Sequence, residues 1–162
     1  MPRRLVADST VSPTGLKWAA PAGGGKVLQV LSDTTQTRVA NATNSFVDTG
    51  LEITITPTSA TSKILIMITA DSYKTDGNVN NAIIWRLFRD ATRIQSTQDD
   101  KYTGTALIQM NTWSCIYLDS PATTSATTYK LQFANINNSA TVAIVPNNND
   151  GQGNMTLMEI GA

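Results

Sequence analysis

Few residues of this chain could carry out acid–base or nucleophilic chemistry. The 162 residues include no histidine, which removes the usual general base, the common zinc ligand and every Ser-His-Asp arrangement. Glutamate occurs only at Glu52 and Glu159, each inside a strand-like segment. Asp99 and Asp100 are the only adjacent acidic pair and could serve a glycosidase, but neighbouring carboxylates in a polar loop are more often simply hydrated. The residue types therefore argue against an enzyme and predict no catalytic residue.

A glycine-rich segment, Gly23-Gly-Gly-Lys26, has the composition of a phosphate-binding loop but not its pattern. That pattern requires glycine five residues before the final glycine and serine or threonine after the lysine, where Ala20 and Val27 stand instead. The segment also leads into a strand-like pattern, whereas a phosphate cradle requires a following helix. We interpret it as a linker and not as a cofactor site.

Metal and thiol chemistry have little support in the sequence. Loops 76–78 and 147–153 offer oxygen ligands for calcium, but neither has the EF-hand spacing that ends in glutamate, and both have ordinary turn composition. The single cysteine, Cys115, lies in an apolar strand pattern and is interpreted as a buried structural thiol. The sequence predicts no metal site, no cofactor and no intrachain disulfide.

The net charge is zero, but basic residues are concentrated near the N-terminus. Residues 1–26 contain four basic residues and one acidic residue, so this segment could dock on an acidic surface, although four scattered charges can equally have no role. No dense basic patch is present, which argues against nucleic acid as a partner. The sequence also lacks a long apolar run, so no membrane span is expected.

The positions of the apolar residues indicate strands throughout the chain after residue 25. The segment Leu51-Glu-Ile-Thr-Ile-Thr56 alternates with a period of two, which is typical of a half-buried strand. Polar clusters separate successive strand patterns, and no segment makes a convincing helix. Strands are expected at residues 26–37, 46–56, 63–72, 82–89, 92–96, 105–118, 129–134, 141–145 and 155–160. The predicted fold class is all-β, an antiparallel jelly-roll sandwich of eight to ten strands with a short irregular N-terminal arm.

The segment Pro21–Gly25 divides the chain into two parts. Its glycines add backbone freedom and its proline disfavours helix, as expected at a hinge. We expect an attachment arm with a glycine-rich hinge at residues 1–25 and a jelly-roll head domain at residues 26–162. Trp18 lies in the arm outside any strand pattern, which is explained if it packs on a partner or on the head. The residues expected to anchor the arm are Arg3, Arg4, Leu5, Leu16 and Trp18.

Two strand patterns, Ile64–Ile68 and Ile83–Phe88, are apolar on both faces. In an antiparallel sandwich one face of a strand meets the core and the other usually meets water, so a second apolar face requires a cover. Another subunit would provide that cover, and the alternative is cover by the chain's own loops or arm. The residues expected in a trimer interface or in the core are Ile64, Ile66, Ile68, Ile84, Trp85, Phe88, Trp113 and Tyr117.

Strand alternation assigns the loops to two ends of the sandwich, because successive antiparallel strands place successive loops at opposite ends. We expect loops 73–81 and 97–104 at one end of the sandwich. We expect loops 57–62, 119–127 and 146–153 at the other end. If residues 26–56 form two strands, the arm enters at the second end, and the first two loops point outward, where they could contact a receptor. An extra strand at residues 46–50 would reverse this assignment. The candidate receptor residues are Tyr73, Lys74, Asp76, Asn78, Lys101 and Tyr102.

Several long segments resemble virion proteins. The first part of the chain resembles a junction that precedes a β head in tail-fibre and virion structural proteins of tailed bacteriophages, especially marine and cyanobacterial ones. The residues that carry this resemblance are Leu5-Val-Ala-Asp-Ser-Thr10 and Gly15-Leu-Lys-Trp-Ala-Ala-Pro-Ala-Gly-Gly-Gly-Lys-Val-Leu-Gln-Val30. The stretch from Phe46-Val-Asp-Thr-Gly-Leu51 to Lys63-Ile-Leu-Ile-Met67 and the terminal Leu157-Met-Glu-Ile-Gly161 also fit. The resemblance covers most of the chain and implies a non-enzymatic virion part. It also implies a homotrimer with a head like those of the tumour-necrosis-factor and complement globular-head group.

The resemblance leaves two placements open. A short tail fibre or tail appendage would dock through its arm on another virion protein and could contact a host surface glycan or receptor. The chain begins at its own Met with no long shaft before the junction, which fits a capsid decoration (cement) protein equally well. Either protein would be assembled in the host cytoplasm and lie at the virion surface. Two rivals are a monomeric carbohydrate-binding module with a sugar-stacking aromatic platform, and a depolymerase that uses Asp99 and Asp100.

Overall fold

The computed structural model describes residues 25–75, 81–100, 108–136, 141–144 and 151–161. Ten strands and no helix occupy these residues, so the described chain contains no helix that could cross a membrane. The strands are β1 (Val27–Thr35), β2 (Val39–Asn41), β3 (Val47–Ile55), β4 (Lys63–Lys74), β5 (Ala82–Arg89), β6 (Thr92–Asp100), β7 (Gln109–Asp119), β8 (Thr127–Asn135), β9 (Val142–Ile144) and β10 (Gly153–Ile160). The fold is the antiparallel jelly-roll sandwich that the sequence predicted.

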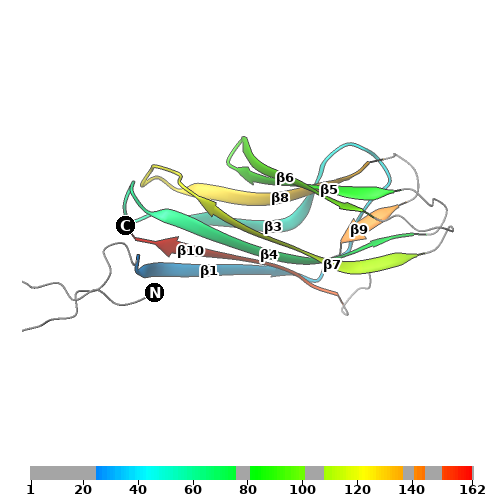
Figure 1. The fold of residues 1–162 in the computed structure, drawn as a ribbon, viewed down its shortest axis with the longest axis horizontal. Helices are drawn as coiled ribbons and strands as arrows, with labels where there is room; N and C mark the ends of the chain where they lie inside the picture. The colour runs from blue at the N-terminus through cyan, green and yellow to red at the C-terminus, as the bar shows by residue number, and fades with distance from the viewer. Residues whose placement is uncertain (1–24, 76–80, 101–107, 137–140, 145–150, 162) are drawn as a thin grey trace, which may run out of the picture.

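The strands form two packed sheets, shown as two layers in Figure 1. Sheet A places β1, β10, β4 and β7 side by side in that order. The short strands β9 and β2 continue sheet A beyond the start of β10, because β9 pairs with Ser72–Lys74 of β4. Sheet B places β3, β8, β5 and β6 side by side. Most consecutive strands therefore lie in different sheets, and the chain closes a single core between them.

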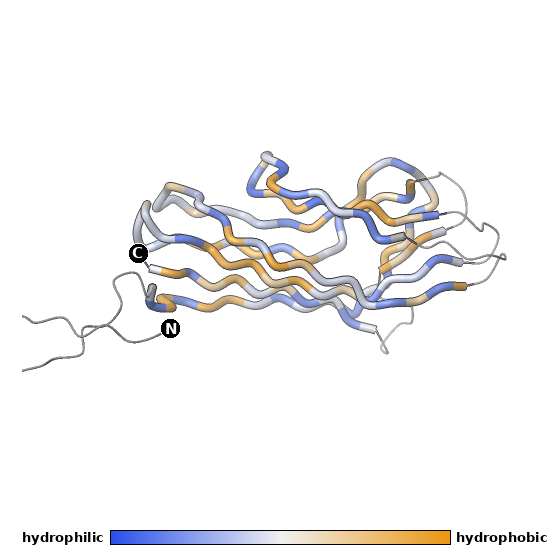
Figure 2. Tube along the Cα trace, in the orientation of Figure 1, coloured by the Kyte–Doolittle hydropathy of each residue, from blue (hydrophilic) through white to orange (hydrophobic). Residues whose placement is uncertain are grey.

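The core follows the alternation in the sequence. From Lys63 to Ser72 every second residue of β4 is buried, as Ile64 and Ile66 show, because side chains on a strand point alternately to its two faces. Burying a side chain of this size stabilises the fold by about 1.5–3 kcal/mol. Trp85 of β5 fills the centre of the sandwich and is almost completely buried. Figure 2 shows how hydrophobic stretches recur along β4, β5 and β7.

Among the differences between the observed and the predicted strand boundaries, two concern β2 and β6. The short strand β2 was missed, because three residues are too few to show a period; it is held by pairing with β9. The segment Thr97–Asp100 was expected in a loop but extends β6, where it pairs with β5 up to Ala82. In both places pairing with a neighbouring strand overrides a weak local pattern.

The two ends of the sandwich are distinct. We call the end where β1 begins and β10 finishes the proximal end, since Val27 pairs with Ile160 there, and Ile160 with Lys63. The segments after β3 and β7 lie at this end, as expected for loops 57–62 and 119–127. Strands β4 and β6 finish, and strands β5 and β7 begin, at the opposite, distal end. Residues 76–80 and 101–107 of the predicted loops 73–81 and 97–104 lie outside the described residues.

Loop 146–153 was expected at the same end as loops 57–62 and 119–127. Its residues 146–150 lie outside the described residues, but the strands on either side of it meet it at the distal end. The strand before it finishes at Ile144, which pairs with Ser72, and the strand after it begins at Gly153, which pairs with Ala70. Both neighbours in β4 lie at the distal end. The reason is the length of β9: three residues do not carry the chain to the other end of the sheet.

The hairpin between β5 and β6 turns at Asp90-Ala91, where the sequence predicted a tight turn. Asp90 has a φ of 51°, a left-handed conformation that aspartate tolerates better than most residues. Its amide donates a hydrogen bond to the Thr128 carbonyl at 2.7 Å, and the Thr128 amide donates to its carboxylate at 2.9 Å. The turn is thereby fastened to β8 at the proximal end.

Candidate assembly surface

The outer face of sheet A carries a continuous apolar row near the proximal end. Val30 pairs with Met158, Met158 with Leu65, and Leu65 with Leu118. Residues that are directly opposite in antiparallel strands share a face and have Cβ atoms about 5 Å apart, so these four side chains run across the sheet from β1 to β7. They point away from the core, because Leu157, the neighbour of Met158, is fully buried.

The apolar character fades toward the distal end. In the next row Met67 pairs with Ile116, while the β1 side of the row is polar. The third row is polar throughout and consists of Thr34, Asn154, Thr69 and Ser114. We call the six side chains of the first two rows the apolar patch: Val30, Met158, Leu65, Leu118, Met67 and Ile116. The patch thus spans sheet A at its proximal half and is bordered by hydroxyl and amide side chains.

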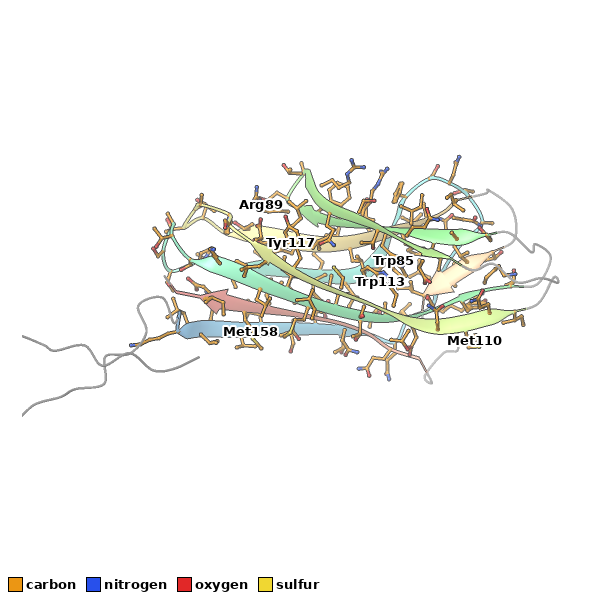
Figure 3. All side chains as sticks on the ribbon, in the orientation of Figure 1. Trp85, Arg89, Met110, Trp113, Tyr117 and Met158 are labelled. Carbon is orange, nitrogen blue, oxygen red and sulfur yellow. The ribbon has the colours of Figure 1, made fainter. Side chains whose placement is uncertain are left out.

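The two ends of the patch are strongly exposed. Ile116 is 72% exposed, and Leu118 and Val30 are each 51% exposed. Among the described residues, seven of the eight large hydrophobic side chains that are exposed lie on β1, on β7 or just before β7. Figure 3 shows Met158 on the side of sheet A away from sheet B, whereas Trp85 and Trp113 lie between the sheets. Contiguous exposed apolar surface on a soluble domain commonly marks an interaction site.

The patch contains no charged or hydrogen-bonding group. The patch can contribute to binding by burying apolar surface away from water, which stabilises a complex by about 25 cal/mol for each Å² buried. The arrangement therefore suits association with another apolar surface and offers nothing for catalysis or ion binding.

The outer face of sheet B has a different character. Ile84 and Phe88 alternate there with Arg86, whose guanidinium carbon lies 3.5 Å from the centroid of the Phe46 ring. Farther along the face, Lys130 and Asp48 form a salt bridge of 3.2 Å. Charged side chains and a cation–π contact interrupt this face, so Ile84 and Phe88, expected in an interface or in the core, lie partly buried on a mixed surface.

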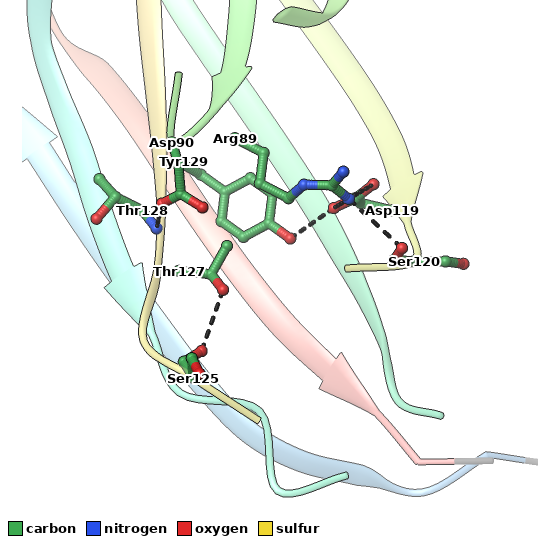
Figure 4. A network of polar contacts seen from close by, with 8 residues as sticks. All are labelled: Arg89, Asp90, Asp119, Ser120, Ser125, Thr127, Thr128 and Tyr129. Atoms are coloured by element: carbon green, nitrogen blue, oxygen red, sulfur yellow. Dashed lines mark hydrogen bonds and ion pairs between the residues drawn. The ribbon is translucent and has the colours of Figure 1, made fainter. Parts of the chain in front are cut away.

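A buried polar network joins the proximal end of β7 to sheet B, as Figure 4 shows. The Asp119 carboxylate accepts a hydrogen bond of 2.7 Å from the Tyr129 hydroxyl and bonds of 3.0 Å from Arg89 Nη1. Burial and the hydrogen bond to this carboxylate raise the pKa of Tyr129 well above its ordinary value. The network holds Leu118, the neighbour of Asp119, in place at the end of the patch.

A second polar contact lies at the proximal end of β10. The Glu159 carboxylate accepts a hydrogen bond of 2.6 Å from Gln29 Nε2. It also accepts bonds of 2.8 Å and 2.7 Å from the Thr58 amide and hydroxyl. Burial raises the pKa of Glu159, but the hydrogen bonds to the carboxylate outweigh burial and lower the pKa to about 2. Glu159 thus fastens the β3–β4 loop beneath the patch.

The residues expected in an interface or in the core separate into two groups. Ile64, Ile66, Ile68 and Trp85 are core residues, whereas Trp113 and Tyr117 are partly buried and pack against the core. Next to Tyr117 on β7, the outward-facing side chains are Ile116 and Leu118, which are exposed and which the sequence reasoning missed. The sequence contains a pattern that could have indicated them. The segment Trp113-Ser-Cys-Ile-Tyr-Leu118 is apolar on both faces, as are Ile64–Ile68 and Ile83–Phe88.

Only two of the six expected receptor residues belong to the described part of the chain. Tyr73 and Lys74 belong to β4 and are buried, contrary to the sequence expectation. The strand runs farther than its apolar pattern because it pairs with β7 up to Lys74, and Tyr73 contacts the guanidinium of Arg38. Four of the expected receptor residues lie outside the described residues: Asp76, Asn78, Lys101 and Tyr102. The five arm residues Arg3, Arg4, Leu5, Leu16 and Trp18 also lie outside them.

The carboxylate of Asp99 joins the two sheets. The Asp99 carboxylate of β6 accepts hydrogen bonds of 3.1 Å from Ser72 Oγ and from Asn111 Nδ2, both in sheet A. Within the described part of the chain no group of three or more Cys, Asp or Glu side chains could hold a metal ion. Burial raises the pKa of the Cys115 thiol, as expected for a structural thiol.

Comparisons with known proteins found similarity only among solved structures. No family model matches it, and no curated protein does. Among solved structures, it is similar to a protein of the T13 particle of infectious bursal disease virus, with a TM-score of 0.45, 10% identity and coverage of 99% of this chain and 41% of that chain.

The VP2 subviral particle of the same virus has a TM-score of 0.39 and 9% identity, with coverage of 98% of this chain and 44% of that chain. A mutant VP2 from derived T=1 particles has a TM-score of 0.41 and 10% identity, with coverage of 97% and 41%. The chain therefore spans about two fifths of the length of these viral proteins. Identities near 10% carry no information about a shared activity.

Proposed function

We propose that this chain is a non-enzymatic structural protein of a tailed-bacteriophage virion. Its head is a homotrimer held together through the apolar patch, and residues 1–25 attach it to another virion protein as a short tail fibre or tail appendage at the virion surface. The observation that carries the proposal is the patch itself, because an exposed apolar face that spans sheet A requires a partner surface.

The polar residues of the head support a structural role. Three carboxylates accept hydrogen bonds that join strands or sheets, those of Asp99, Asp119 and Glu159. A catalytic carboxylate would instead face a substrate in a cleft, with its pKa matched to its task. The polar chemistry of the head holds the sandwich together and leaves the apolar face as its principal feature.

The trimer has two supports. The first is the resemblance of residues 5–30, 46–67 and 157–161 to tail-fibre proteins with trimeric heads. The second is the shape of the patch, which ends in exposed side chains on both flanks of the sheet, Val30 on β1 and Ile116 on β7. A ring closes when one flank of each copy contacts the other flank of the next, as in a head-to-tail cyclic assembly.

The mass of the purified chain in solution tests the trimer. Sedimentation equilibrium should give three times the chain mass of 17.4 kDa. A monomeric mass would reject the trimer and favour the rival carbohydrate-binding module.

Immunogold labelling of purified virions tests the location. Label confined to the tail supports the appendage, whereas label over the whole capsid would identify a decoration protein that stabilises the head. A chain that lacks residues 1–20 tests the arm: it should remain a folded trimer and be absent from virions. A truncated head that still decorates particles would reject attachment through the arm.

A further inference from the structure

The point where the arm joins the head is fixed by close backbone packing. A Cβ atom on Gly25 would lie 2.2 Å from the Gly161 carbonyl oxygen and 2.5 Å from Ile160 Cγ2. The Gly161 amide donates a hydrogen bond of 2.8 Å to the Lys26 carbonyl. The predicted hinge is Pro21–Gly25, of which only Gly25 belongs to the described residues. At Gly25 the missing side chain permits close contact between two backbone segments. The last residue before β1 is therefore held against the end of β10.

This fixed point adjoins the apolar patch. Val27, two residues after Gly25, pairs with Ile160, and Val30 of the patch follows on the same strand. Val27 and Leu28 are themselves exposed, and Leu28 packs close to Gly161. Apolar surface therefore continues from the patch to the root of the arm. Figure 1 shows the C-terminal end of β10 beside the start of β1.

We propose that the contact between copies gathers their N-terminal arms at one end of the assembly, so that the arms attach as a bundle. The partner that covers the patch is a second copy of this chain. The inference rests on the proposed self-association and adds that the root of each arm lies at the edge of the contact.

The size of the outer face fits a contact between copies. The four strands β1, β10, β4 and β7 have 9, 8, 12 and 11 residues, and at a spacing of about 4.8 Å and a rise of about 3.3 Å per residue they cover about 630 Å². A standard interface buries about 800 Å² on each partner, with an apolar centre and a polar rim. The apolar patch has such a polar border on its distal side, in the row of Thr34, Asn154, Thr69 and Ser114.

Arms that are gathered at one end of the assembly should attach more strongly than a single arm. Once one arm of an assembly is bound, the others are held near their sites at an effective concentration of about a millimolar. Weak contacts made by single arms then add to a strong attachment without any new contact. A fixed root favours this effect, because each arm leaves its head at a defined point close to its neighbours.

Cross-linking between single cysteines tests the proposal without the virion partner. In a Cys115→Ala background, Lys26→Cys places a thiol on an exposed residue at the root of the arm. Arg93→Cys is the matched control, since Arg93 is exposed on β6 of sheet B. Each protein is treated with a short bismaleimide and separated on a denaturing gel, after its fold is checked by circular dichroism.

The Lys26→Cys protein should form covalent dimers and trimers with a yield that does not change on dilution, because the thiols lie within one assembly. The Arg93→Cys protein should remain mostly monomeric on the gel. If the wild-type chain is a trimer but both variants cross-link equally, or only the control does, the gathering of arms is wrong and the trimer stands. A wild-type monomer by sedimentation would overturn the proposed self-association together with this inference.

Discussion

The indole rings of Trp85 and Trp113 stack with 4.5 Å between their centroids and 15° between their planes. Trp85 belongs to β5 in sheet B and Trp113 to β7 in sheet A, so the stack joins the two layers. Because Trp113 faces inward, its neighbours at alternate positions on β7 must face outward, and these include Ile116. The stack thereby sets which side of β7 contributes to the apolar patch.

Replacing Trp113 by alanine should destabilise the head. A fully buried tryptophan costs about 3–5 kcal/mol when it is truncated to alanine, and partial exposure places Trp113 at or below the lower end of that range. Urea denaturation followed by circular dichroism measures the free energy of unfolding. Ser114→Ala is the control, since Ser114 is exposed on the outer face and should change the value by less than about 0.5 kcal/mol. Equal effects of the two changes would contradict the stacked arrangement.

The Tyr129 hydroxyl should contribute to stability through Asp119. Tyr129→Phe removes a hydrogen bond of 2.7 Å to a charged acceptor and should lower the free energy of unfolding by about 1–3 kcal/mol. Tyr117→Phe, outside this network, is the control.

The same hydroxyl should produce a loss of stability at high pH. Burial and the contact with Asp119 raise the pKa of Tyr129, so the folded state holds this proton more tightly than the unfolded chain. The stabilisation is complete below the ordinary tyrosine pKa of about 10 and is lost as the pH rises above it. Wild-type stability should therefore decline more steeply in alkali than that of Tyr129→Phe. Parallel profiles would show that the hydroxyl does not titrate as proposed.

Glu159 should make the head sensitive to strong acid. Its folded pKa of about 2 lies below the ordinary glutamate pKa of about 4.3, so its stabilising effect is complete above pH 4.3 and is lost as the pH falls toward 2. Glu159→Gln should lower stability at neutral pH and flatten the acid part of the profile, because the amide cannot accept the same set of hydrogen bonds as a carboxylate. Glu52→Gln, at the other and exposed glutamate, is the control. Thermal unfolding between pH 2 and pH 7 provides the measurement, and an unchanged acid profile in Glu159→Gln would refute this account.

A charge in the apolar patch should dissociate the assembly without unfolding the head. Leu118→Lys places an ammonium group on a side chain that is 51% exposed, so the isolated head tolerates it while a dry interface does not. Sedimentation velocity should show a shift from trimer to monomer, with an unchanged circular dichroism spectrum. Thr34→Lys, on the polar part of the same sheet face, is the control and should leave the trimer largely intact. A trimer that survives Leu118→Lys would place the contact elsewhere.

Much of the architecture could be predicted from local pattern. The alternation in Leu51–Thr56 and the apolar run Ile64–Ile68 predicted strands that the structure contains as parts of β3 and β4. Such predictions succeed because side-chain direction along a strand is a local property with a period of two. The loops at residues 57–62 and 119–127 also fell at the expected end, since counting strands requires only the sequence.

The assembly surface could not be predicted in full. In β4 the pattern shows two apolar faces, but only pairing with β10 and β7 decides that Ile66 faces the core and Leu65 faces outward. Tyr73 and Lys74 were expected in a loop, yet extended pairing with β7 keeps them in the strand and buries them. These outcomes depend on which strands become neighbours, which a single-strand pattern does not contain.

The sequence by itself determined an all-β head, the strands that build it and the lack of histidine-based chemistry, because composition and period two are properties of the chain alone. Only the tertiary structure decided that Val30, Met158, Leu65 and Leu118 form one row, since they come from four strands that are distant in sequence and meet through backbone pairing. It also decided the role of Gly25, whose lack of a side chain is required by close contact with Gly161. Contacts between distant segments, and the surfaces they create, arise only when the sheets are assembled.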